Sequence, residues 1–117
     1  MSSTAEARLI LERCDDLAGL SAQPERLERV HLSPEHAAAN ALVESWMAEA
    51  GLTTWQDAAG NMCGRLEGAE PDLPALLLGS HIDTVPDAGR YDGMLGVLLA
   101  IAVVNRLRDR PLPFALE

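Results

Sequence analysis

The chain has 117 residues, which suits one domain with a modest core, and 48% of them are apolar, so global disorder is excluded. A formal net charge of −9, with no basic stripe interleaved with aromatic residues, argues against a nucleic-acid partner. The longest apolar run, residues 94–104, falls short of the roughly 20 residues that span a bilayer. Residues 1–7 lack a signal-peptide pattern, so we expect a cytoplasmic protein with no membrane partner.

Two helices are predicted in the first half of the chain. Ser3 and Glu6 have the spacing of a capping box, and an apolar face continues from them to residue 18. After a loop over 19–28, Ser33-Pro34-Glu35 opens the second helix, because serine caps, proline suits the first turn and glutamate suits the helix dipole. Trp46 lies in its apolar stripe and is expected in the core, and Gly51 ends the helix.

The second half reads as strands around one further helix. Residues 52–57 and 62–67, separated by a turn at 59–61, predict a hairpin. Ala75–Leu78 is a continuous apolar run that predicts a strand buried on both faces. A long apolar helix over Met94–Leu107 and a new strand at 114–116 follow it. This order is a βαβ pattern, so we expect an α/β fold with helices packed on a mixed sheet.

The residues with chemical potential follow the buried strand, where open α/β sheets bind ligands. In an extended segment His81 and Asp83 point to the same side. A metal-binding imidazole usually donates its second N–H to a carboxylate, and Asp83 suits that role. Asp92 returns on a loop, and its two oxygens can bridge two cations. Metals about 4 Å apart can share a hydroxide and polarise a carbonyl.

Structural roles compete with these functional interpretations. A single histidine or an Asp-Gly turn is more often structural, and His-x-Asp alone is a weak motif. His31 and His36 are assigned structural positions, in a loop and in the first turn of a helix. Thr84 and Tyr91 are near enough in sequence to contact a substrate. The two cysteines, Cys14 and Cys63, are too few for a disulfide framework, and both are expected to be small buried hydrophobes.

An ordered set of stretches covering nearly the whole chain resembles the hydantoinase/carbamoylase family of amidases. That family includes allantoate amidohydrolases, N-carbamoyl-amino-acid hydrolases and β-ureidopropionases, within a superfamily of dinuclear exopeptidases. The stretches are Ser33-Pro34-Glu35, Ala38-Ala39, Trp46-Met47, Ala50-Gly51-Leu52, Asp57-Ala58-Ala59-Gly60-Asn61, Gly64-Arg65, Gly79-Ser80-His81-Ile82-Asp83-Thr84-Val85 and Gly89-Arg90-Tyr91-Asp92-Gly93-Met94-Leu95-Gly96-Val97.

The resemblance implies that residues 1–117 form the N-terminal part of one zinc-exopeptidase-like catalytic domain. It implies hydrolysis of a non-peptide C–N bond in a ureido or N-carbamoyl substrate, such as allantoate or an N-carbamoyl amino acid, with two zinc or manganese ions. His81 matches a ligand of one metal and Asp92 the carboxylate that bridges both. Asp83 matches the catalytic residue behind the histidine. Relatives often have a cis peptide bond directly after the bridging aspartate, here between Asp92 and Gly93.

The family continues beyond the position of Glu117. There it has a Glu-Glu pair that supplies the general base and a metal ligand, two further histidine ligands and an inserted dimerisation or lid domain. Two protein ligands cannot hold two cations firmly, since each needs about four donors or more. We therefore expect residues 1–117 alone to be inactive or nearly so.

Two alternatives stay open. An aminoacylase- or peptidase-like parent is less favoured, because the segment 89–93 fits the carbamoylase branch better. The other alternative is a non-catalytic remnant that forms homo-oligomers through unpaired sheet edges.

Overall fold

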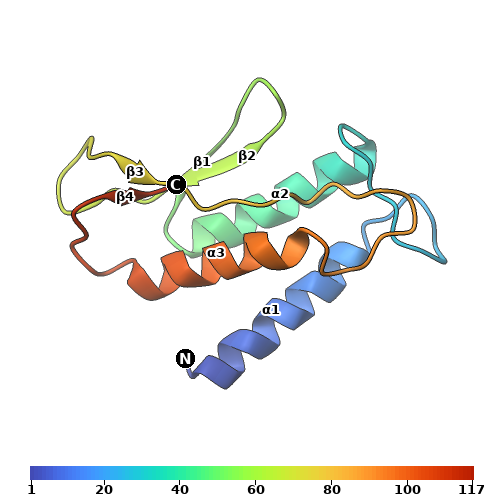
Figure 1. Ribbon diagram of the computed structural model, residues 1–117, viewed down its shortest axis with the longest axis horizontal. Coiled ribbons are helices and arrows are strands. Elements are labelled where there is room, and N and C mark those ends of the chain that lie inside the picture. Colours follow the sequence, from blue (N-terminus) through green and yellow to red (C-terminus); the bar gives the residue numbers. More distant parts are fainter.

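The computed structural model describes residues 1–117 as three helices beside a small, discontinuous sheet (Figure 1). The helices are α1 (Ser3–Ala18), α2 (Pro34–Glu49) and α3 (Met94–Leu107). The molecule measures 47 × 36 × 18 Å, and in so flat a body only 20 of the 117 residues are buried. No helix combines the length and the apolar character that crossing a membrane would require.

The helix boundaries follow local signals, with one correction. The cap of α1 is Ser2, whose Oγ accepts the N–H of Ala5 at 3.2 Å, so the predicted capping box at Ser3 is wrong by one residue. Glu6 instead pairs with Arg106 of α3, because a guanidinium is a stronger partner for a carboxylate than a backbone N–H. The predictions for α2 and α3 are confirmed. Ser33 caps α2, and α3 spans the predicted residues.

The strands form a mixed sheet, as predicted. β1 (Thr53–Gln56) and β2 (Met62–Arg65) make the antiparallel hairpin, and β3 (Ala75–Leu76) pairs in parallel with β4 (Ala115–Leu116). An antiparallel bridge between Leu66 and Leu116, with reciprocal hydrogen bonds of 2.9 Å, joins the two pairs. The strand β4 therefore lies between the hairpin and β3, and the β3–α3–β4 unit is the expected βαβ motif.

The prediction that Ala75–Leu78 is a strand buried on both faces is wrong. The strand β3 ends at Leu76, although the N–H of Leu78 still donates to the carbonyl of Glu117 at 2.8 Å. Leu76 is 51% exposed and Leu77 is 70% exposed. The physical reason is position, because β3 lies at the margin of a thin molecule and its main neighbour is β4.

The core lies among the three helices and the segment that follows β3. Trp46 is 8% exposed, which confirms its predicted core position, and the guanidinium of Arg13 stacks over its ring at 4.8 Å. Cys14 is fully buried as predicted, whereas Cys63 is only half-buried. The other principal members of the cluster are Leu17, Val43, Ile82, Met94, Leu98 and Ile101.

We expect Leu98→Ala to lower the free energy of unfolding by about 2–5 kcal/mol, because it opens a cavity in the core between the helices. Leu98 is 2% exposed, whereas its neighbour Leu99 on α3 is 47% exposed, so Leu99→Ala is a matched control. Urea unfolding followed by circular dichroism measures both. Equal losses for the two variants would show that α3 does not bury the face described here.

Candidate metal centre

The first turn of α3 presses directly against the segment that carries His81. A Cβ added to Gly93 would lie 2.4 Å from His81 Cε1 and 2.6 Å from its carbonyl oxygen, and one added to Gly96 would lie 2.8 Å from Ser80 Cβ. Such distances exclude any side chain, and Gly93 also has a φ of +97°, which favours glycine. The two glycines therefore allow α3 to begin in contact with Ser80 and His81, and they place the residue that follows Asp92 directly against His81.

The orientation of the His81 ring is fixed by a backbone contact. Its Nδ1 lies 2.9 Å from the carbonyl oxygen of Asp83 and 3.5 Å from Asp83 Oδ1. A carbonyl only accepts hydrogen bonds, so Nδ1 is the donor in this contact, and in the neutral ring Nε2 then keeps its lone pair. The side chain is 53% exposed. This is the state in which a histidine is ready to bind a cation through Nε2.

Asp92 lies on a turn immediately before α3. Its N–H donates to the carbonyl of Gly89 at 3.2 Å, and the side chain is exposed. The nearby Arg90 pairs with Asp15 of α1 rather than with Asp92. Every peptide bond is trans, so the expected cis bond between Asp92 and Gly93 is wrong, and the turn is made instead by the positive φ of Gly93.

The donors suit a divalent cation in type but supply only part of a site. An imidazole nitrogen and a carboxylate are common ligands of zinc and manganese. No group of three or more His, Cys, Asp or Glu residues is arranged so that it could hold a metal ion. His81 and Asp92 therefore fit part of a donor set.

A hollow of about 380 Å³ adjoins His81 on the side of α2 and the hairpin turn. His36 is buried there and its Nδ1 accepts the N–H of Leu32 at 2.9 Å, which confirms its structural assignment. Burial is the main cause that lowers the pKa of His36, with His31 adding to it and Asp83 opposing it. The neutral ring that accepts from Leu32 is therefore the favoured form.

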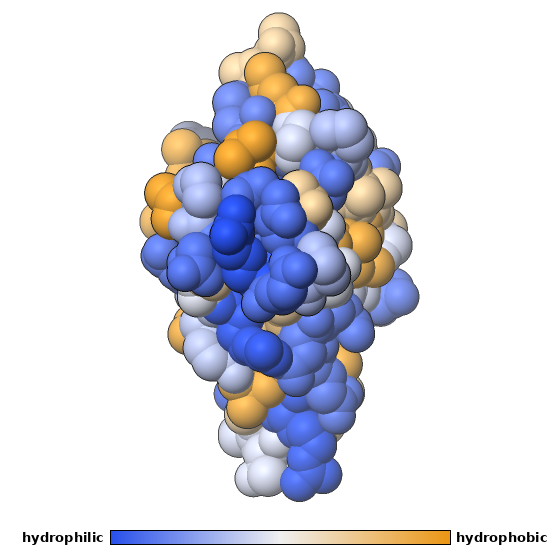
Figure 2. All heavy atoms as spheres, turned by 90° about the vertical axis from the view of Figure 1, so that its right-hand side faces the viewer, coloured by the Kyte–Doolittle hydropathy of each residue, from blue (hydrophilic) through white to orange (hydrophobic).

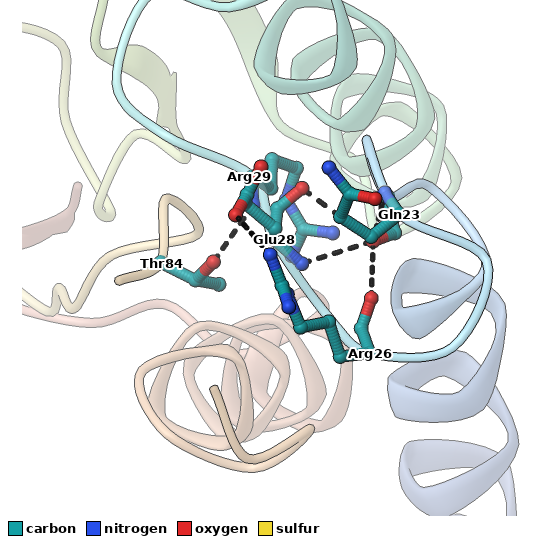
Figure 3. Close-up of polar contacts among 6 residues, drawn as sticks. Gln23, Arg26, Glu28, Arg29 and Thr84 are labelled. Carbon is teal, nitrogen blue, oxygen red and sulfur yellow. Dashed lines mark hydrogen bonds and ion pairs between the residues drawn. The ribbon is translucent and has the colours of Figure 1, made fainter. Parts of the chain in front are cut away.

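Thr84 lies in the segment that carries His81, and it contacts Arg29, which lies in the connection between α1 and α2 (Figure 3). Thr84 is 8% exposed and its Oγ1 accepts the N–H of Arg29 at 2.8 Å, so its hydroxyl is engaged in the interior. Tyr91 is half-exposed, and its expected contact with a substrate stays a prediction. Sequence reasoning missed Arg29, which occupies a polar loop and has no local motif.

The loop that carries Arg29 is closed by Ser21. The Ser21 hydroxyl donates to the carbonyl of Arg26 at 2.7 Å and accepts the N–H of Glu28 at 2.9 Å. Beyond it, Leu27 bridges to Ala88. The end of the molecule that carries these loops presents mostly hydrophilic residues to solvent (Figure 2).

The βαβ unit, with polar residues just beyond the carboxyl end of β3, defines this chain as part of an α/β domain of the kind that carries enzyme sites at that edge. No family model matches the chain. It is 51% identical over 81 residues to allantoate deiminase 1 of Glycine max, covering 69% of this chain and 17% of that protein. It is 46% identical over 83 residues to N-carbamoyl-L-amino-acid amidohydrolase of Pseudomonas sp. (strain NS671), covering 71% and 20% respectively.

Solved structures agree with the sequence matches. The crystal structure of AtUAH in complex with glyoxylate superposes with a TM-score of 0.88 at 39% identity, over 94% of this chain and 27% of that one. A hydantoinase/carbamoylase family amidase from Burkholderia ambifaria gives 0.85 at 34% identity, over 95% and 28%. Most of this chain is therefore similar to an allantoate deiminase, to an N-carbamoyl-L-amino-acid amidohydrolase and to a solved structure of the hydantoinase/carbamoylase family, and it spans less than a quarter of the length of the two curated relatives.

We expect Gly93→Ala to cost about 1–3 kcal/mol of folding free energy from its positive φ alone, and to displace His81 as well. Gly89→Ala in the same motif is the control, since nothing lies within 4 Å of its added Cβ and its φ is not positive. Urea unfolding and the imidazole NMR signals of His81 measure the two effects. Wild-type signals in Gly93→Ala would contradict the close contact.

The stability of the protein should fall as the pH drops below about 6.5, partly because the pKa of His36 is lower in the folded state than in the unfolded chain. The unfolded state then binds the proton more readily. This residue contributes at most about 1.4 kcal/mol per pH unit. His36→Asn keeps an acceptor near Leu32 and should flatten the slope of unfolding free energy between pH 7.5 and 5. An unchanged slope would rule out His36 as its source.

Proposed function

We propose that this chain supplies part of the metal site of an amidohydrolase that cleaves a non-peptide C–N bond in a ureido or N-carbamoyl compound. Allantoate and N-carbamoyl amino acids are the proposed substrates. The observation that carries the proposal is His81, whose Nδ1 is held by a carbonyl at 2.9 Å while Nε2 stays free beside the Asp92 turn. The names of the relatives, a deiminase of allantoate and an amidohydrolase of N-carbamoyl amino acids, support the reaction class.

His81 would hold a zinc or manganese ion through Nε2, and Asp92 would hold the same ion and a second one through its carboxylate. Ions bound in this way polarise a carbonyl and lower the pKa of water. The chain's own residues orient the donors. The hydrogen bond from Nδ1 to the Asp83 carbonyl fixes the ring, and the Asp83 carboxylate, 3.5 Å away, adds negative charge that makes the imidazole a better ligand.

The complete reaction is proposed for a polypeptide that contains this segment, in the cytoplasm. Residues 1–117 offer two donors to a pair of ions that each need about four, so we propose that they turn over no substrate by themselves. Hydrolysis at a dinuclear site also needs a general base near the attacking water. Neither His81 nor Asp92 can serve as that base while it binds metal.

One observation favours a different role. Leu76 and Leu77 at the margin of the sheet are 51% and 70% exposed, and an exposed apolar edge strand is a template for pairing with another copy. A self-associating, non-catalytic module would show defined oligomers in light scattering and no change in folding stability on adding metal.

The test of the proposed function measures metal binding and hydrolysis separately. Titration of the 117-residue protein with Co²⁺ or Mn²⁺ should show weak binding that His81→Ala and Asp92→Asn abolish. Asp87→Asn is the control, because this exposed aspartate lies on the same loop and asparagine tolerates its φ of 58°.

A polypeptide that contains the segment should release ammonia from allantoate or from N-carbamoyl amino acids in the presence of Mn²⁺ or Zn²⁺. His81→Ala should lower that rate by more than about 100-fold, the upper range for residues that only support a ligand. Binding that survives both site substitutions, or hydrolysis that survives His81→Ala, would refute the assignment.

A further inference from the structure

Arg29 is a buried cation without an acidic partner. Its side chain is fully buried in the connection between α1 and α2, and no carboxylate lies within 4.0 Å of its guanidinium. Nε donates to the carbonyl of Ile82 at 2.8 Å, and Nη1 donates to the carbonyls of Leu17 at 2.6 Å and Leu20 at 2.8 Å. Nη2 is buried and has no hydrogen-bond partner. All the hydrogen bonds of the guanidinium are therefore to backbone carbonyl oxygens.

The backbone of Arg29 binds the same segment as its side chain. Its N–H donates to Thr84 Oγ1 at 2.8 Å, and its carbonyl accepts the N–H of Thr84 at 2.6 Å. Figure 3 shows Thr84 facing Arg29 across this contact. Together with the side-chain hydrogen bond to Ile82, these contacts hold in place the residues immediately before and after Asp83. All of these hydrogen bonds lie on the buried side of the segment.

These hydrogen bonds determine which side chains of residues 81–84 face outward. Along an extended segment, successive side chains point to opposite sides, so a shift by one residue would exchange the two sets. Ile82 and Thr84 are each 8% exposed, whereas the side chains of His81 and Asp83 are 53% and 40% exposed. Holding Ile82 and Thr84 inside therefore holds His81 and Asp83 outside.

We propose that Arg29 is a positioning residue that fixes the register of residues 81–84, so that the His81 ring and Asp83 face the candidate metal centre. The planar guanidinium suits this task, since it presents several donors in a fixed geometry that one lysine ammonium cannot reproduce. The importance of Arg29 for catalysis rests on the proposed function. Its positioning of residues 81–84 does not, because the hydrogen bonds that position them are present in the protein without metal.

The energetic cost of burying the charge of Arg29 supports a specific role for its guanidinium. Burial lowers the pKa of Arg29, and the charge of Asp83 only partly opposes that effect. A buried ionic group is often replaced by a packed apolar side chain with little loss of stability. A methionine would fill the same space without this cost, but it would remove the donors to the carbonyls of Ile82 and Leu20 and leave the carbonyl of Leu17 with backbone donors only. The arginine is therefore required for its donors and not for its volume.

The test compares Arg29→Met and Arg29→Lys with Val104→Ala in the full 117-residue chain. Val104 is 4% exposed and lies ten residues along α3 from Met94, about 15 Å away at the rise of a helix. It therefore controls for a general loss of stability. Three quantities are measured where every variant is folded: the ¹⁵N shifts of the His81 imidazole, hydrogen exchange of the Thr84 amide, and affinity for Co²⁺.

Arg29→Met should abolish the Nδ1-protonated signature of His81, speed exchange at Thr84 by about tenfold or more relative to Val104→Ala, and weaken Co²⁺ binding by about 10–100-fold. Arg29→Lys should fall between the wild type and Arg29→Met. If Arg29→Met is folded and keeps the wild-type His81 shifts and Thr84 exchange, the proposal is overturned. If the wild type binds no Co²⁺ while the His81 shifts still respond, the positioning stands and the proposed function fails.

A second pair of variants covers the case in which Arg29 substitutions unfold the chain. Thr84→Val removes the acceptor of the Arg29 N–H, whereas Thr84→Ser keeps a hydroxyl. Thr84→Val should shift the His81 signals in the same direction as Arg29→Lys, and Thr84→Ser should restore them. Identical His81 spectra in the valine and serine variants would overturn the proposal.

Discussion

The contact between the first turn of α3 and the backbone of Ser80 and His81 is the constraint on which the candidate site depends. It requires glycine at positions 93 and 96, because an added Cβ would lie 2.4 Å from the His81 ring and 2.8 Å from Ser80. The same approach sets where α3 begins and places Gly93, the residue after Asp92, against the histidine. One close backbone contact thus links the βαβ unit to the geometry of the donors.

The α1 helix, although distant in sequence, anchors both sides of this contact. Leu17 in its last turn and Leu20 just beyond it accept hydrogen bonds from Arg29, which grips the segment after His81. Asp15 in the same region pairs with Arg90, which lies two residues before Asp92. In a molecule only 18 Å thick, the core alone cannot surround the site segments, so polar contacts from the end of α1 perform part of that function.

Local signals predicted most of the fold but little of what supports the site. The starts of α2 and α3 and the hairpin were predictable, because caps, glycines and periodicity act within a few residues. The exposure of Leu77 was not, since an apolar run reports the character of a strand and not whether another layer covers it. Family motifs singled out His81, Asp83 and Asp92. Arg29 was invisible, because its partners at 17, 20 and 82 are backbone carbonyls, which any sequence provides.

The ion pair between Arg90 and Asp15 has a consequence for the charge of the site. Exposed pairs of this kind contribute little to stability. Arg90 is nevertheless the cation nearest in sequence to Asp92, and if it turned toward that residue it would neutralise the carboxylate. The hydrogen bond and charge of Asp15 raise the pKa of Arg90 and hold its guanidinium at α1. In the structure Arg90 therefore neutralises Asp15 and forms no ion pair with Asp92, whose side chain is exposed beside the start of α3.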